Sequence, residues 1–570
     1  MKQLSGLDAS FLHLETPEMP MHVGGLNVFE LPKGYHGDFH EDVKAHIVSR
    51  MHLASIFTKK LALMPFDMAN PVWVDDDAVD VDYHIRKITL PKPGTMAQLE
   101  TYVGRLHSSL LDRSRPLWEF YVFDGMKSGQ AAFYSKIHHA ALDGKGGEAL
   151  AQAMLDITPT PRTVRKAEPR SGPVYQPSVN DLVGAAFRNN LAQYWKLIKL
   201  LPAAARAIGD VALPAKGEDG KRHMGMLKNF KLGPKTPLNV AITNQRSFST
   251  VTISLAQARE IAKAFDGSLN DAVMAICSGA LRRYLAGRAA LPEKTLVAAV
   301  PVSLREEGNT ELNNQVSMML LNLATDIADP RKRTREIVKA SKAMKQTLKS
   351  VKSVMPTDFP SLGAPWLMSG LVSLYGRSRL ADKMAPIANV AISNVPGANL
   401  PLYLAGARMT TYFPVSIVVH GVALNITVQS YNGNLDFGLI ACRRAVPDIK
   451  DLARMMSESH EELLDAARRI AVPVEAKATA ATKVDAAPAK KATAQKSAKT
   501  APQRKTSSAR AKPAPTPAAT QATVPPKART AGRKKAAVAA PPAKPAKATP
   551  SAKAKTKLTG KANRAQPPHL

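Results

Sequence analysis

The pattern of apolar and polar residues predicts an α/β chain in which short strands alternate with amphipathic helices. Residues 131–137 form an aromatic and β-branched run typical of a strand, and residues 144–157 predict a turn followed by a helix. In the second half, Ser268 is an N-cap candidate for a helix that reaches about Tyr284, after a shorter helix over 256–264. A basic helix over 330–351 and a last helix over 447–470 complete the helical elements.

The second half of the chain is also rich in predicted strands. The dipeptide Asn432-Gly433, flanked by Tyr431 and Asn434, is a strong signal for a tight β-hairpin. Strands are predicted over residues 248–255, 295–302, 315–323, 388–393, 409–415, 421–431 and 435–440.

These elements divide the chain into four regions: 1–158, a linker over 159–245, a second α/β domain over 246–471, and a tail over 472–570. The linker is rich in Pro, Lys and Arg, and within 182–211 it carries an apolar stripe beside basic residues. That stripe resembles an interfacial amphipathic helix, and a helix that buries the same face on its own protein is an equal alternative. The stripe consists of Leu191, Tyr194, Trp195, Leu197, Ile198 and Leu201.

The net charge of +32 over 570 residues is concentrated at one end of the chain. From Ala471 to Leu570 there are 22 Lys or Arg against 2 Asp or Glu, which leaves a net charge of +12 for the rest. This tail is of low complexity and cannot bury enough apolar surface to fold, so we expect it to be disordered. Its basic repeats are suited to binding nucleic acid or another polyanion without sequence preference, which is a competing function for the protein.

Composition also limits location and metal chemistry. Cys277 and Cys442 are too few for a disulfide framework and do not have metal-ligand spacing, so no metal site is predicted. The first 20 residues lack the basic and apolar segments of a secretory signal, and no apolar run is long enough to span a bilayer. We therefore expect a cytoplasmic protein whose membrane contact is peripheral.

The sharpest chemical signal is the segment from His138 to Gly144, His-His-Ala-Ala-Leu-Asp-Gly. Adjacent side chains at a strand end point to opposite faces, so only one of His138 and His139 enters a given cleft easily. This argues against both ligating one metal ion and favours a single general base, with the neighbouring His and Asp143 shaping the turn. Gly144 permits the tight backbone geometry where the strand gives way to a helix.

The segment resembles the His-His-x-x-x-Asp-Gly signature of coenzyme A-dependent acyltransferases related to chloramphenicol acetyltransferase and to peptide-synthetase condensation domains. Further stretches narrow the resemblance to bacterial wax ester synthase/diacylglycerol acyltransferases, and in order they cover about residues 1–470. These stretches are Leu4-Ser5-Gly6-Leu7-Asp8-Ala9-Ser10-Phe11, Met21-His22-Val23-Gly24-Gly25, Pro116-Leu117-Trp118-Glu119, Asn270-Asp271, Val300-Pro301-Val302-Ser303-Leu304-Arg305 and Ser393-Asn394-Val395-Pro396-Gly397.

The resemblance implies two chloramphenicol-acetyltransferase-like domains around a central tunnel that holds the catalytic histidine. It implies an acyl-CoA substrate, no cofactor, and diacylglycerol or a long-chain alcohol as acceptor, dissolved in a membrane or lipid-droplet surface. By position, His139 is the general base and His138 its catalytic neighbour. An amide-forming condensation enzyme is a third reading, which the absence of carrier-protein and adenylation segments disfavours.

The remaining candidate residues have supporting roles. The resemblance implies that Asp143 fixes the loop by pairing with an arginine, for which Arg305 is a candidate. Asn270 and Asp271 either hold the geometry of the site or cap the helix that follows. Pro116, Leu117, Trp118 and Glu119 are expected to line or brace the tunnel, with Trp118 packing instead of taking part in the chemistry.

Overall fold

The computed structural model describes residues 2–62, 70–142, 146–166, 215–216, 222–223, 232–303, 316–351, 380–382 and 384–481. Contacts between Cα atoms group Met1–Ala487 into one compact unit and Pro488–Leu570 into another, and every element below belongs to the first. The predictions for the linker helix over 182–211 and for most of the tail lie outside the described residues, as do Asp143, Gly144 and Arg305.

The first of two six-stranded sheets has the order β14-β15-β2-β7-β6-β5. All eight residues of β7 are buried, because helices cover one face of this sheet and the second half of the protein covers the other. This explains why the first four residues of β7, Ala131 to Tyr134, form a continuous apolar run instead of an alternating one. The strands are β14 (Tyr403–Leu404), β15 (Ala407–Val415), β2 (His22–Glu30), β7 (Ala131–His138), β6 (Trp118–Asp124) and β5 (Ile85–Thr89), and the helices of this half are α2 (Phe39–Val48), α3 (Val81–His84), α4 (Met96–His107) and α5 (Gly146–Met154).

The second sheet has the order β10-β17-β16-β13-β11-β12, and its helices pack on one face over a single apolar core. Tyr431 pairs with Asn434 in the β16–β17 hairpin, and Asn432 and Gly433 both have positive φ, as the Asn-Gly pattern predicts. The strands are β10 (Arg246–Ser254), β17 (Asn434–Cys442), β16 (Leu424–Tyr431), β13 (Val390–Val395), β11 (Val297–Ser303) and β12 (Val316–Asn322), and the helices are α7 (Leu255–Ala264), α8 (Leu269–Ala286), α9 (Pro330–Val351) and α11 (Ile449–Ala481).

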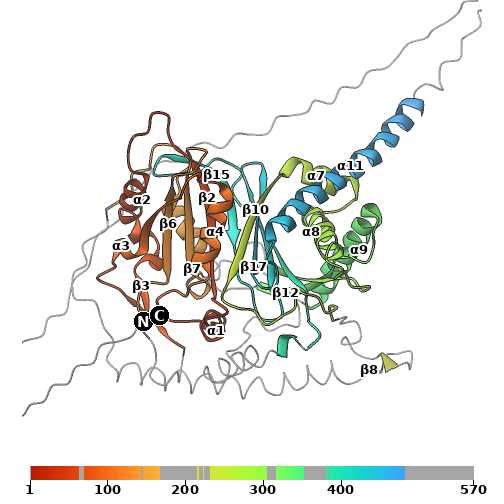
Figure 1. Ribbon diagram of the computed structural model, residues 1–570, viewed down its shortest axis with the longest axis horizontal. Coiled ribbons are helices and arrows are strands. Elements are labelled where there is room, and N and C mark those ends of the chain that lie inside the picture. Colours follow the sequence, from red (N-terminus) through yellow and green to blue (C-terminus); the bar gives the residue numbers. More distant parts are fainter. Residues whose placement is uncertain are drawn as a thin grey trace, which may run out of the picture. The chain divides into compact units, whose positions relative to one another are not determined.

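A strand from the second half of the sequence completes the first sheet. β15 pairs antiparallel with β2, and Figure 1 shows it in teal among the red and orange strands of the first half. A second link joins α4 to β10, where the Glu100 carboxylate accepts hydrogen bonds from Ser249 Oγ at 3.1 Å and from the Thr250 backbone at 2.8 Å. The two halves therefore share one sheet and a common apolar core, although residues 246–471 supply all six strands of the second sheet.

The remaining elements are short. A three-stranded sheet lies beside α1, which begins with Ser5 as its N-cap and ends at Leu14. None of the described helices has the length and apolar character needed to cross a membrane. The short elements are β1 (Lys2–Gln3), β3 (Lys59–Ala62), β4 (Val72–Asp75), α1 (Gly6–Leu14), η1 (Met51–Leu53), η2 (Ser55–Phe57), η4 (His139–Ala141), η6 (Leu380–Asp382) and the pair β8 (Ala215–Lys216) and β9 (Arg222–His223).

Most predicted elements of the second half are confirmed to within a few residues. The helix after Ser268 is α8, the basic helix is α9, and each of the seven predicted strands overlaps an observed one. The strand predicted at 131–137 is β7, which ends at His138, and the helix predicted after it is α5. The last helix, α11, extends to Ala481 and is therefore longer than the helix predicted over 447–470.

Candidate active site

His138 is the last residue of β7, and its ring is fully buried. Its Nδ1 accepts a hydrogen bond from the backbone N–H of Ala140 at 3.1 Å, so the proton of the neutral ring is on Nε2. That Nε2 lies 3.2 Å from Oε2 of Glu15. Because both nitrogens face protein groups and the ring has no exposed surface, His138 is a supporting residue in this geometry.

His139 begins the short helix η4 and retains some exposure to solvent. Its ring stacks on Phe11 of α1, with centroids 3.9 Å apart and planes 14° apart, and its backbone N–H donates to the carbonyl of Met21 at 2.9 Å. Nδ1 is enclosed without a hydrogen-bond partner among the described residues, so the exposed part of the residue lies elsewhere. Of the two histidines, His139 is the one with exposed surface.

Burial keeps His139 uncharged. Burial lowers the pKa of His139 to about 4, and only the residue's own backbone acts in the opposite direction. The ring is therefore neutral at pH 7 and able to accept a proton, as a general base must be.

Glu15, which follows α1 directly, is the partner that orients His138. Burial alone would raise the pKa of Glu15, but the hydrogen bond from His138, together with Arg113 and the Met21 N–H, lowers it to about 2. Arg113 approaches Oε1 at 2.8 Å through Nη2, and the Met21 N–H donates to Oε2 at 3.0 Å. This buried carboxylate thus ties α1, the start of β2 and the end of β7 to the histidine pair.

An apolar cavity of about 160 Å³ adjoins the motif on the side of Ile137 and Leu142. Two of its three polar side chains are engaged within the protein: Ser135 Oγ accepts from the Gly25 N–H at 3.1 Å, and Asn27 donates to the sulfur of Met409 at 3.1 Å. The third is Tyr412, and the other lining side chains are apolar. The interior is therefore suited to hydrocarbon. It is lined by Val23, Gly24, Asn27, Phe29, Phe133, Ser135, Ile137, Leu142, Gly147, Leu150, Ala151, Met154, Leu155, Leu404 and Tyr412.

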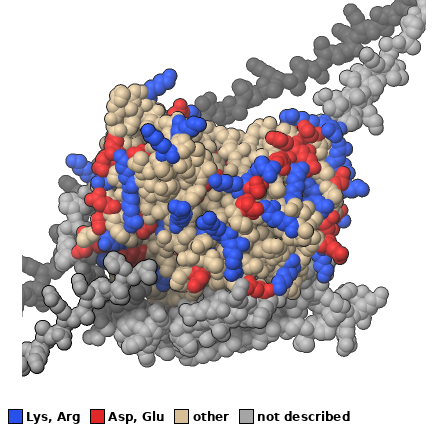
Figure 2. Space-filling model, in the orientation of Figure 1, with Lys and Arg blue, Asp and Glu red and all other residues tan. Residues whose placement is uncertain are grey.

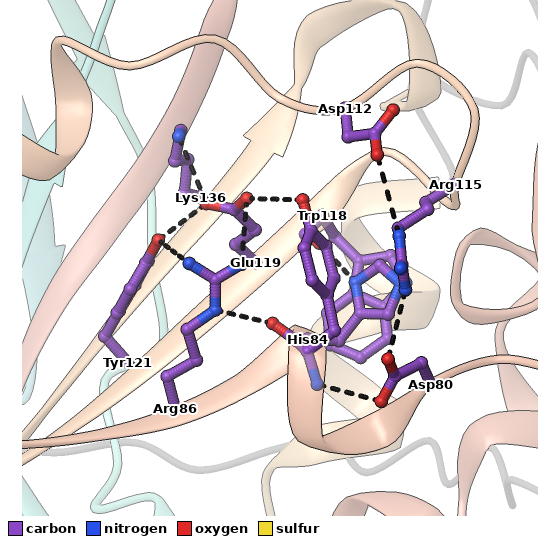
Figure 3. A network of polar contacts seen from close by, with 10 residues as sticks. Asp80, His84, Arg86, Asp112, Arg115, Trp118, Glu119, Tyr121 and Lys136 are labelled. Atoms are coloured by element: carbon purple, nitrogen blue, oxygen red, sulfur yellow. Dashed lines mark hydrogen bonds and ion pairs between the residues drawn. The ribbon is translucent and has the colours of Figure 1, made fainter. Parts of the chain in front are cut away.

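The segment Pro116–Glu119 lies where the sequence suggested, next to the motif, and its side chains are buried. The carbonyl of Leu117 accepts from the His138 N–H at 3.0 Å. Trp118 has no exposed surface and stacks on His84 with centroids 4.2 Å apart (Figure 3). Its indole N–H donates to the Phe57 carbonyl at 3.3 Å. Packing and this one hydrogen bond occupy the indole ring, as the sequence prediction of a packing role expected.

Glu119 anchors the polar network of Figure 3. It faces Lys136 across β6 and β7, with Lys136 Nζ 3.2 Å from Oε2 and side-chain exposures of 1% for Lys136 and 6% for Glu119. Tyr121 donates to the same oxygen at 2.6 Å, and Arg86 lies 3.5 Å from the other. Because these groups satisfy one another, Glu119 braces the strands next to His138 and does not point into an open site.

The other predicted site residues divide into two groups. Asp271 is buried and accepts hydrogen bonds from the backbone N–H of Ser268 at 2.7 Å and from its hydroxyl at 2.8 Å, so it caps the N-terminus of α8. Asn270 is partly exposed in the first turn of the same helix. For Asp143, Gly144 and Arg305, which lie outside the described residues, the sequence predictions stay predictions.

Sequence reasoning missed three residues that the fold brings to the site. Phe11 and Glu15 lie more than a hundred residues before His139, and Tyr412 reaches the cavity from β15, which belongs to the second half of the chain. Phe11 stood within the motif Leu4–Phe11, but nothing in the sequence marks Glu15 as the partner of His138. Only the pairing of β2 with both β7 and β15 brings these segments together.

Comparison with known proteins identifies the family of this fold. Residues 4–273 match the wax ester synthase/diacylglycerol acyltransferase catalytic domain, and residues 312–464 match the WS/DGAT C-terminal domain. The two matches together include the histidine pair, Glu15 and the strands that line the cavity. The chain belongs to the wax ester synthase/diacylglycerol acyltransferase family.

Individual relatives are similar over nearly their whole length. A probable diacylglycerol O-acyltransferase of Mycobacterium tuberculosis is 35% identical over 466 residues, which is 80% of this chain and 98% of the relative. The O-acyltransferase WSD of Acinetobacter baylyi is 32% identical, over 80% of this chain and 96% of the relative. Among solved structures, the wax ester synthase/diacylglycerol acyltransferase from Marinobacter aquaeolei VT8 matches with a TM-score of 0.59 and 30% identity, over 82% of this chain and 100% of that one.

Proposed function

We propose that this protein transfers a fatty acyl group from a coenzyme A thioester to the hydroxyl group of a lipid acceptor. With diacylglycerol the product is triacylglycerol, and with a long-chain alcohol it is a wax ester. The observation that carries the proposal is a neutral, partly exposed His139 whose neighbour is fixed by Glu15, directly beside an apolar cavity. The names of the relatives, which include diacylglycerol O-acyltransferases, support the same reaction.

In the proposed mechanism, His139 removes the proton from the acceptor hydroxyl as its oxygen attacks the thioester carbonyl carbon. A new C–O bond forms, the C–S bond breaks, and the coenzyme A thiolate leaves. The proton held by His139 then goes to this sulfur, so the enzyme returns to its starting state. The transfer is direct, and no cofactor takes part. Ser135, a hydroxyl near the motif, is engaged by the backbone of Gly25 and does not serve as a nucleophile.

The cavity beside Ile137 is the proposed site for part of the acyl chain. A hydrocarbon chain would lose contact with water there, and the Ser135 and Asn27 side chains keep their partners within the protein. The remaining parts of acyl-CoA and of the acceptor would occupy a tunnel between the two halves of the protein, as the family resemblance implies. Both substrates are lipids in part, so we expect the cytoplasmic enzyme to work at the surface of a membrane or a lipid inclusion.

The test is thiol release from palmitoyl-CoA by the full chain, with diacylglycerol and hexadecanol offered separately. The wild type should release thiol only when an acceptor is present, and His139→Ala should lower the rate by about 10² or more. The exposed residue His36 provides the control His36→Ala, which should behave as wild type. Release without any acceptor, or an active His139→Ala, would refute the mechanism.

A further inference from the structure

The helix α9 has two different faces. Its inner face is packed against α8, β12 and α11, and the residues there are buried: Ile337 and Ser341 have no exposed surface, and Arg333 is 3% exposed. Arg333 donates to the carbonyls of Ile327 and Ala328 at 3.1 and 3.0 Å, which fixes the start of the helix. Lys345 Nζ lies 3.4 Å from Ser268 Oγ, which ties its later part to α8. The helix is therefore held firmly in one orientation.

The outer face of α9 is a stripe of cations. Lys332, Arg335, Lys339 and Lys342 are all exposed and span about 15 Å of the helix at 1.5 Å per residue. In the described part of the chain, only Lys339 has a carboxylate within ion-pair distance, Glu336 at 3.7 Å, and both side chains are exposed. Arg335, Lys339 and Lys342 also line a shallow hollow of about 460 Å³.

This concentration of charge differs from the rest of the folded part. The sequence of α9 has eight Lys or Arg and one Glu, a net charge of +7, whereas residues 1–470 carry +12 in total. Over the face drawn in Figure 2, Lys and Arg side chains are interspersed with Asp and Glu, so positive and negative groups largely offset one another. On α9 the positive charges are not offset by negative ones. Repulsion between like charges does not stabilise a solvated helix, so stability does not explain the stripe.

The shape of the stripe indicates which anion it meets. A compact phosphate ligand is usually held by converging, partly buried donors, but these cations are exposed and spread along a line. Binding to single-stranded nucleic acid uses aromatic side chains for base stacking, and α9 has none. A line of flexible cations on a rigid helix is suited to a broad surface of negative charge, where each Lys or Arg adds to the attraction.

We propose that the outer face of α9 docks the protein onto an anionic phospholipid surface. The inference deepens the proposed function, because a lipid acceptor is dissolved in such a surface and docking would bring the enzyme to it. It does not depend on the predicted linker helix or on the tail. The lysine and arginine stems would lie along the headgroup region while their charged ends contact the lipid phosphates.

The test is flotation of the full chain with vesicles of phosphatidylcholine containing about one third phosphatidylglycerol. The test variant reverses three stripe charges, Arg335→Glu, Lys339→Glu and Lys342→Glu. A matched control reverses three exposed lysines of other segments, Lys92→Glu, Lys127→Glu and Lys294→Glu. Both variants have the same net charge and the same tail, so any difference in vesicle binding between them is due to the substitutions on α9. Thermal unfolding confirms that both are folded.

The α9 variant should bind the anionic vesicles at least about tenfold more weakly than the control, and neither wild type nor control should bind pure phosphatidylcholine vesicles as strongly. With diacylglycerol in anionic vesicles, its KM for the acceptor should rise by a similar factor. With a water-soluble short alcohol, its rate should equal that of the control.

Equal vesicle binding by the two variants would overturn the proposal. So would a selective loss of duplex DNA binding with vesicle binding retained, since the stripe would then be a nucleic-acid surface. Because flotation requires no turnover, an inactive wild type would refute the acyltransferase mechanism and leave this test intact.

Discussion

Replacing Glu15 by glutamine removes the one charge that orients His138 while keeping the size of the side chain. The carboxylate is 2% exposed, so its interactions are little screened by water. At about 1.4 kcal/mol for each pKa unit, the lowering of the Glu15 pKa from 4.5 to about 2 corresponds to about 3 kcal/mol of folding free energy at pH 7. Because the pKa is lower in the folded state, this stabilisation is complete above pH 4.5 and is lost as the pH falls toward 2.

Glu15→Gln should therefore be less stable than wild type by roughly 2–3 kcal/mol at pH 7 in urea unfolding. His139 follows His138 directly in the chain, so a change in the position of His138 would also move His139. We therefore expect kcat for acyl transfer to fall by about tenfold or more, with a smaller change in the KM for acyl-CoA. The matched control is Glu18→Gln, three residues away, whose side chain is exposed.

Two results would count against this reasoning in different ways. If Glu15→Gln and Glu18→Gln were equal in both stability and rate, the buried carboxylate would not have the role that its contacts indicate. If only stability fell, Glu15 would brace the fold without positioning the base. A double-mutant cycle with His138→Asn measures the coupling directly, and a coupling of about 1 kcal/mol or more is expected.

Three further outcomes follow from the structure. Because the pKa of His139 is lowered to about 4, kcat/KM should be flat from pH 8 to 5 and fall with a midpoint near 4; a midpoint above 6 would contradict the burial argument. Tyr412→Ala should widen the cavity and shift kcat/KM toward longer acyl chains by a factor of about ten, measured with a series of acyl-CoA lengths; an unchanged profile would place the chain elsewhere. Arg50 and Asp156 form a buried ion pair at 2.9 Å, so Asp156→Asn should lower stability by about 3 kcal/mol in urea unfolding, and a loss below 0.5 kcal/mol would show the pair to be dispensable.

The parts of the fold that could be predicted from the sequence are those set by local chemistry. The aromatic run before His138 predicted β7, Ser268 predicted the start of α8, and Asn432-Gly433 predicted the β16–β17 hairpin. In each case the signal lies within a few residues: a backbone preference, a cap or a turn.

Partners that are distant in the sequence could not be predicted in this way. The sequence predicts a strand over residues 409–415, but nothing in it says that β15 pairs with β2 in the first sheet. The same holds for Glu15, which resembles any other glutamate until the fold places it 3.2 Å from His138. The two adjacent histidines were predicted to face different ways, but which of them meets substrate came from the family resemblance, and the contacts of each ring supply an independent reason.

The central claim is that His139 is the base and His138 its buried support. The most direct test compares transfer from palmitoyl-CoA to diacylglycerol by wild type, His139→Ala and His138→Ala, with folding checked for each. We predict that His139→Ala loses about 10² or more in kcat while its KM for palmitoyl-CoA changes little, and that His138→Ala loses less in kcat but more in stability. A folded His138→Ala without activity beside an active His139→Ala would contradict the account.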